Sequence, residues 1–179
     1  MPDVKQTITD FYRVAQERDF SRDFQFRVLN IQNADGSVVV SEDDLVYARG
    51  GTIPGREISE NTVSYMGLDF RVPGSVKYAG SYEIEFLCDT SDTLRNLMLT
   101  WTRDTFDDAT STGNYFIAKE TSIVDLVQLD TQLERVAQYT LVGVYPKQVG
   151  DITYTLDGTG APVNFSMTLG YHYIRSETY

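Results

Sequence analysis

The stretch PVNFSMTLGYHYI, residues 162–174, decides the fold of this chain. Apolar side chains stand at every second position from Val163 to Tyr173, and Asn, Ser, Thr, Gly and His fill the positions between them. A strict period of two places successive side chains on opposite faces of a β-strand. The segment therefore predicts one strand with an apolar face and a polar face.

Other segments carry the same signal. In SYEIEFLCD, residues 81–89, Tyr82, Ile84, Phe86 and Cys88 share one face, which predicts a half-buried strand. NADGS is typical of a hairpin turn and SEDD of a solvated loop. Further strands are expected at residues 24–31, 38–40, 45–49, 122–130, 134–145 and 151–156.

An arm and a hairpin are predicted over residues 50–80. GGTIPGREISEN, residues 50–61, has the glycines, proline and charges of an irregular connection. TVSYMGLDFRVPGSVKYAG, residues 62–80, predicts a hairpin whose turn lies at Pro73 and Gly74.

Two helices are predicted beside the strands. The first covers residues 7–18, where Thr7 and Asp10 form a capping pattern. The second covers residues 91–103, where Ser91 and Asp92 are placed to cap its start. Its apolar residues recur at helical spacing, namely Leu94, Leu97, Met98 and Trp101.

Together these elements predict a single domain over residues 1–179. The fold class is mainly β, a β-sandwich or partial barrel of antiparallel sheets with one or two flanking α-helices. The first ten residues lack a basic region followed by an apolar one, so we expect no signal peptide. No run reaches the roughly 20 apolar residues of a membrane span, so no membrane partner is expected.

Charge and cysteine content limit the possible functions. The chain has 15 Lys and Arg against 26 Asp and Glu, a formal net charge of −11, which disfavours a nucleic-acid-binding module. It does not disfavour a surface that DNA passes without sticking. With one cysteine, Cys88, no intrachain disulfide can form, which suits a reducing compartment.

Catalytic and cofactor motifs are not evident. His172 is the only histidine, so a zinc site of the usual nitrogen and sulfur ligands is nearly excluded. Glu83 and Glu85 share a strand face about 6.5–7 Å apart, but any E-x-E strand gives that spacing. We therefore expect a protein that is not an enzyme, with no cofactor and no metal.

GVYPKQVGDITYTLDG, residues 143–158, is interpreted as a corner between two strands. A proline, two charges, an amide and a glycine interrupt the apolar pattern there. The motif positions of this corner are Tyr145, Pro146, Val149, Gly150 and Asp151.

The order of these motifs resembles the tail tube proteins of contractile-tailed bacteriophages, especially T-even-like myophages. In that family a strand leads into an aromatic-Pro-x-x-Val-Gly-acidic turn and on to a final strand ending in aromatics, as in residues 139–174 here. Residues 52–89 resemble the family's loop, hairpin and strand, and the second helix follows at the family's position. The resemblance covers most of the chain.

The resemblance implies a structural role. Tail tube subunits form stacked homohexameric rings whose sheets join into one β-barrel, and DNA passes through the lumen without specific binding. A sheath surrounds the tube, and baseplate and terminator proteins close its ends. The subunit would be assembled in the host cytoplasm and reside in the virion.

Two sets of residues follow as candidates on this basis. Residues expected to face the lumen are Glu83, Glu85, Ser166 and Thr168. Residues expected to contact the next ring are Ile53, Pro54, Arg56 and Glu57.

Three alternatives remain open. The chain could be the tube subunit of an extracellular injection particle or a type VI secretion system, with protein as cargo. It could be a baseplate or tail-terminus protein of the same fold that forms a single ring. A monomeric β-sandwich that binds carbohydrate through exposed Tyr and Trp101 is the third, although Trp101 lies on an apolar helix stripe where core packing is favoured.

Overall fold

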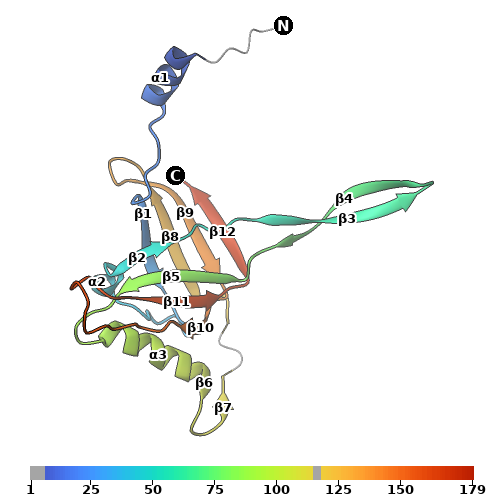
Figure 1. Cartoon of the computed structure of the whole chain (residues 1–179). Coiled ribbons are helices and arrows are strands. Elements are labelled where there is room, and N and C mark those ends of the chain that lie inside the picture. Colours follow the sequence, from blue (N-terminus) through green and yellow to red (C-terminus); the bar gives the residue numbers. More distant parts are fainter. Residues whose placement is uncertain (1–6, 115–117) are drawn as a thin grey trace.

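The computed structural model describes residues 7–114 and 118–179. Two four-stranded antiparallel sheets form the body of the protein (Figure 1). The first sheet has the strand order β1 (Phe26–Ile31), β8 (Ile123–Leu129), β9 (Arg135–Val142) and β12 (Tyr173–Thr178). The second has the order β10 (Tyr145–Val149), β11 (Asn164–Gly170), β5 (Ser81–Leu87) and β2 (Ala48–Gly51). The mainly β, antiparallel fold class is therefore confirmed.

The core lies between these sheets, whose strands cross in Figure 1. Alternate residues of β5 and β11 point into it, and the rings of Phe86 and Phe165 stack with their centroids 5.6 Å apart. Leu126 and Leu141 face them from the first sheet and are fully buried. Each such side chain contributes about 1.5–3 kcal/mol relative to solvent exposure.

Helix α3 (Thr93–Thr105) runs beside β10 and covers one side of this core (Figure 1). Leu94, Met98 and Trp101 are buried, and Trp101 Nε1 donates a hydrogen bond to Asn33 Oδ1 at 3.2 Å. Leu97, which was expected on the same apolar stripe, is 36% exposed. Core packing is thus the role of Trp101.

The other two helices are peripheral. Helix α1 (Ile8–Glu17) begins after Thr7 with the predicted capping box and stands apart from the sheets (Figure 1). Residues 41–44 were expected to be a loop, but Ser41 caps a short helix, α2 (Glu42–Leu45), because its hydroxyl accepts the Asp44 amide. Residues 1–6, on which part of the signal-peptide expectation depends, lie outside the described residues.

The prediction of one strand over residues 162–174 was wrong. The chain leaves the second sheet after Gly170 and joins the first at Tyr173, where the His172 amide bonds to the Val142 carbonyl at 2.9 Å. Tyr171, between the two strands, remains buried. Because both sheets enclose the same core, the alternation of apolar residues continues across the change of sheet.

The prediction that the Tyr-Pro motif forms a corner between two strands was also wrong. Tyr145, Pro146 and Val149 belong to strand β10, and Gly150 and Asp151 follow it. Pro146 is tolerated because β10 is an edge strand and the register shifts between Pro146 and Gln148. Residues 151–156, expected to be a strand, form none.

The hairpin forms, but its turn is not at Pro73 and Gly74. Strands β3 (Glu57–Tyr65) and β4 (Leu68–Lys77) meet at Met66 and Gly67, both with positive φ. Pro73 pairs with Glu60 beside an irregularity in register, and Gly74 lies against Ser59. Residues 57–61, expected to be irregular, are therefore strand, and the hairpin extends away from the body (Figure 1).

Smaller differences concern short segments. The turn at residues 33–37 forms, but Val38 makes a single bridge to Gln32 instead of a strand. The strand expected at residues 45–49 is β2, three residues further along. The polar loop after α3 contains a small hairpin of β6 (Phe106–Asp107) and β7 (Thr112–Gly113).

Candidate functional site

The outward face of the second sheet is polar. Register places Glu85 opposite Ser166 and Glu83 opposite Thr168. On the next strands outward, Gln148 of β10 pairs with Thr168, and Gly50 of β2 pairs with Glu85. The structure thus brings all four residues expected to face a lumen onto one surface. We call this surface the polar sheet face, made of Gly50, Glu83, Glu85, Gln148, Asn164, Ser166 and Thr168.

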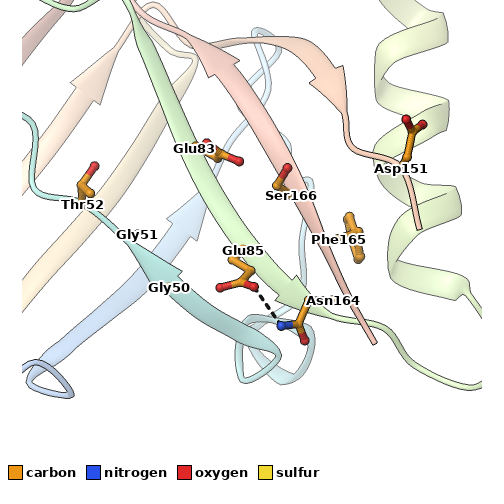
Figure 2. Close-up of a pocket in the computed structure, with 9 residues that line it drawn as sticks. All are labelled: Gly50, Gly51, Thr52, Glu83, Glu85, Asp151, Asn164, Phe165 and Ser166. Atoms are coloured by element: carbon orange, nitrogen blue, oxygen red, sulfur yellow. Dashed lines mark hydrogen bonds between the residues drawn. The ribbon is translucent and has the colours of Figure 1, made fainter. Parts of the chain in front are cut away.

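Hydrogen bonding orders part of this face. Figure 2 shows Asn164 turned toward Glu85, with Nδ2 donating to Oε1 at 2.8 Å. At the β10 border, the Gly150 amide donates to the Ser166 carbonyl at 2.6 Å, and a Cβ there would lie 2.7 Å from Ser166 Oγ. Glycine is therefore required where the chain passes so close to the sheet.

The polar sheet face carries a hollow that extends from β2 to the segment that follows β10. A shallow depression of about 520 Å³ is lined by three carboxylates, those of Glu83, Glu85 and Asp151, and by Thr52, Asn164 and Ser166 among others (Figure 2). None of the described residues that line it is Lys or Arg. Uncompensated carboxylates create a negative potential that repels phosphates and other anions.

The arrangement lacks the features of a catalytic carboxylate pair. Glu83 and Glu85 are exposed to solvent, where their charges are screened. The only histidine, His172, is exposed where the chain crosses to the first sheet. In the described part of the chain, no group of three or more His, Cys, Asp and Glu side chains is placed to hold a metal ion.

Among the described residues, no further strand pairs with either end of the sheet that carries this face. Strands β10 and β2 are its terminal strands, so each presents backbone N–H and C=O groups on its outer side. Both contain register shifts, between Pro146 and Gln148 and between Ala48 and Gly50. The ring of Tyr145 lies over Gly170, where a Cβ would collide with it.

The residues expected to contact a neighbouring ring lie elsewhere. Ile53, Pro54 and Arg56 form the segment between β2 and β3, and Glu57 begins β3. Ile53, Arg56 and Glu57 are exposed, and Pro54 is half-buried. They form the base of the hairpin.

Two apolar surfaces are exposed that the sequence alone did not predict to be exposed. One is a face of the β3–β4 hairpin, and the other is the apolar side of α1, in which no residue is buried. Alternation in residues 61–72 and helical spacing in residues 8–15 carry both signals. Neither pattern reveals that both apolar sides stay exposed in the described part of one chain.

Buried tyrosines lie beneath the β2 edge and the hairpin. Burial raises the pKa of Tyr82, and its hydroxyl has no hydrogen-bond partner among the described residues. A Cβ on Gly51 would fall 2.5 Å from this hydroxyl, so glycine makes room for it. Burial also raises the pKa of Tyr171. Both phenols are neutral structural groups at ordinary pH.

Known proteins are similar to this chain in structure only. No family model matches it, and no curated protein matches it in sequence. A chain in the cryo-EM structure of the anti-feeding prophage (AFP) baseplate superposes with a TM-score of 0.64 at 14% identity, over 90% of this chain and 97% of that one.

Two further solved structures agree. A chain of the AFP tube-terminating cap gives a TM-score of 0.60 at 12% identity, covering 90% of this chain and 93% of its own length. A chain of the sheath-tube complex of PVC, an extracellular contractile injection system, gives a TM-score of 0.56 at 10% identity. The match covers 98% of this chain and 100% of that one. The resemblance to contractile tail tube proteins is thus confirmed at the level of the fold.

Proposed function

We propose that this chain is a structural subunit of the tail tube of a contractile-tailed bacteriophage. Six copies form a ring, rings stack into a tube, and the genome passes through the lumen into the host. The observation that carries the proposal is the polar sheet face, which carries the carboxylates of Glu83 and Glu85 and lies on a sheet whose end strands pair with no further strand among the described residues.

Edge-to-edge pairing explains how a ring can close. If β10 of one copy pairs with β2 of the next, backbone hydrogen bonds continue the sheet around the ring. The contact is head-to-tail, which yields a closed ring when the rotation per copy closes. The polar sheet face then becomes the inner wall, with Glu83, Glu85, Ser166 and Thr168 facing the lumen.

The charge of that wall suits the passage of DNA. Glu83 and Glu85 repel phosphates, so the duplex does not bind to the wall and can slide. The net charge of −11 acts in the same direction. A tube subunit of this kind performs no catalysis and needs no cofactor.

The remaining surfaces serve the assembly. Ile53, Pro54, Arg56 and Glu57 contact the next ring together with the hairpin that follows them. The outside of the tube meets the sheath, and the ends meet baseplate and terminator proteins. No helix in the described residues is long and apolar enough to span a membrane.

Negative-stain electron microscopy of the purified, concentrated protein tests this function. We expect hollow rings or tubes with six-fold end views. A protein that remains strictly monomeric both alone and with a preformed baseplate would contradict the proposal.

A single-ring role is the second candidate. The chains from the AFP baseplate and cap superpose with TM-scores of 0.64 and 0.60, so the same fold also occurs in assemblies that begin or end a tube. The same micrographs decide between the two roles, because a ring protein gives isolated rings at concentrations at which a tube protein stacks. A tube that carries protein cargo would form the same tubes but copurify with protein.

The carbohydrate-binding alternative receives no comparable support. Trp101 is 3% exposed, and its indole nitrogen is already hydrogen-bonded to Asn33. It therefore offers no ring face on which a sugar could stack.

A further inference from the structure

One face of the β3–β4 hairpin is apolar near its tip. Cross-strand pairs place Tyr65 beside Leu68 and Val63 beside Phe70. With Val72 they form what we call the tip face, and each of these side chains is 44–66% exposed. An aromatic side chain has roughly 150–250 Å² of surface that can be buried. At these exposed fractions, the two aromatic and three aliphatic side chains of the tip face together leave on the order of 400 Å² of apolar surface in solvent. That is within the range of the largest patch on a typical monomer, about 300–600 Å².

The opposite side of the hairpin satisfies its own polar groups. Ser64 Oγ donates to Asp69 Oδ1 at 2.6 Å, and Arg71 Nε lies 3.3 Å from Glu60 Oε1. This side is therefore suited to water, and the tip face is the side that offers apolar surface to a partner.

Helix α1 presents a second apolar surface. Ile8, Phe11, Tyr12 and Ala15 recur on one side of the helix, and we call them the α1 stripe. Ile8, Phe11 and Tyr12 are 60–77% exposed. Phe20, from the linker that follows, stacks on Phe11 with ring centroids 5.9 Å apart and extends the stripe.

The two surfaces match in chemistry and size. Helix α1 has 10 residues and is about 15 Å long. The tip face from Leu68 to Val72 is about 14 Å long. One such contact would bury on the order of 400 Å² from each copy, about half of what a partner contributes to a standard interface, so it would add to other contacts between copies.

We propose that the α1 stripe of one copy packs on the tip face of another copy. The inference rests on the proposed function, because it requires that copies of this chain meet in an assembly. In Figure 1 the helix and the hairpin project from the body in different directions, so each extends toward a neighbour rather than toward the other. Because one chain carries both partners, the contact can repeat from copy to copy along rings or stacks.

Disulfide cross-linking tests this contact. The only cysteine is first removed by Cys88→Ser. Chains that carry Ala15→Cys, in the α1 stripe, are mixed with chains that carry Val63→Cys, in the tip face. One of the two carries a mass tag, so that mixed dimers separate from like dimers on a non-reducing gel. The matched control mixes Arg13→Cys with Thr62→Cys, which lie on the polar sides of the same two elements.

The expected result is a yield of mixed dimer at least tenfold above the control under conditions in which the protein assembles. Rings or tubes without this excess would overturn the inference and leave the proposed function standing. Excess mixed dimer without rings would support the inference and count against the ring. If neither dimers nor assemblies form, either alone or with a preformed baseplate, both are wrong.

A chain that carries Ala15→Cys and Val63→Cys together separates packing between copies from packing within one chain. In dilute solution it should form little intrachain disulfide. Rapid intrachain closure of this chain would overturn the proposed contact between copies.

Discussion

Single polar side chains set the boundaries of the elements in this protein. Asp89 accepts hydrogen bonds from the amides of Thr93 and Leu94, at 3.0 and 3.4 Å, and so caps α3. Ser91 and Asp92 were predicted for this role, but Asp92 has a φ of 53° and makes no side-chain cap. The left-handed turn brings Asp89, which lies further back in the sequence, over the helix start.

Ser122 has a comparable role at the corner between the sheets. Its carbonyl accepts the amides of Gly143 and Val144, at 2.9 and 3.1 Å, and its hydroxyl donates to the Val144 carbonyl. Ser122 is fully buried, so these bonds are made without competition from water. The corner is thus held by a residue about twenty positions earlier, not by the Tyr-Pro motif.

Replacing Asp89 tests the cap at this scale. Asp89→Ala should lower the free energy of unfolding at pH 7 by about 1 kcal/mol, the usual cost of losing such a cap. The Ser91 hydroxyl, followed by the Thr93 amide, holds the pKa of this carboxyl below its usual value. A lowered folded pKa means that the stabilisation is present above the unfolded pKa, about 3.9, and is lost as pH falls through the folded value. Thermal unfolding between pH 7 and pH 2.5 measures this.

Asp89→Asn is the matched control, because an amide caps nearly as well but does not titrate. It should stay within about 0.5 kcal/mol of the parent at pH 7, and its unfolding should lack the contribution of Asp89 to the pH dependence. The capping role of Asp89 would be contradicted if Asp89→Ala did not lower the free energy of unfolding at pH 7, or if the loss stayed the same down to pH 2.5.

At the scale of elements, the β3–β4 hairpin stands out because little of the body packs against it. Strands β3 and β4 pair with each other along their length, and neither packs extensively on the two main sheets. A two-stranded hairpin is at best marginally stable in water without further packing. Its apolar side is therefore the part of the hairpin that further packing, such as the proposed contact between copies, would stabilise.

Paired substitutions on the two sides of the hairpin separate assembly from folding. Phe70→Ser, on the tip face, and Arg71→Ser, on the polar side, should each change the free energy of unfolding of the monomer by about 0.5 kcal/mol or less, as surface substitutions do. Phe70→Ser alone should raise the concentration needed for assembly at least tenfold, because it removes apolar surface from a contact. Sedimentation velocity and thermal unfolding measure the two effects. Equal assembly of both variants would argue against a role for the tip face.

At the scale of the whole molecule, charge and shape act together. The chain has a formal charge of −11, and the hollow on the polar sheet face is lined by the carboxylates of Glu83, Glu85 and the neighbouring Asp151. In the ring that we propose, copies join edge to edge and these charges would be repeated around the lumen. Such a wall would repel a polyanion without binding it.

Reversing the charge of that wall tests its role. Glu83→Lys with Glu85→Lys changes the net charge from −11 to −7 per chain. Tubes should still form, because both side chains are exposed and Glu83 makes no hydrogen bond among the described residues. DNA release should be hindered, because the new lysines bind phosphates, and we expect infectivity of particles with this tube to fall at least tenfold.

Asp104→Lys with Asp108→Lys is the control, since it makes the same change of charge at exposed positions near the end of α3, away from the polar sheet face. Its infectivity should match that of the parent. Normal infectivity of the Glu83→Lys, Glu85→Lys particle would show that these residues do not face the lumen.

The sequence by itself determined the local elements and the two-sided character of the strands. Alternation in residues 81–88 and 163–169 depends on which side of a strand meets the core, and this is a local property. The capping box of α1 and the apolar stripe of α3 are local in the same sense. Glu83, Glu85, Ser166 and Thr168 could therefore be selected as polar-face residues without a structure.

Only the tertiary structure decided which strands are neighbours and where the chain changes sheet. Residues 163–173 keep one alternation through the crossing after Gly170, because both sheets share the core. The edge position that admits Pro146 and the αL turn that makes Asp89 a cap depend on distant or non-helical partners. The polar sheet face and its two free edges exist only once β5 and β11 pair, since strand pairing joins residues about eighty positions apart and leaves no local signal.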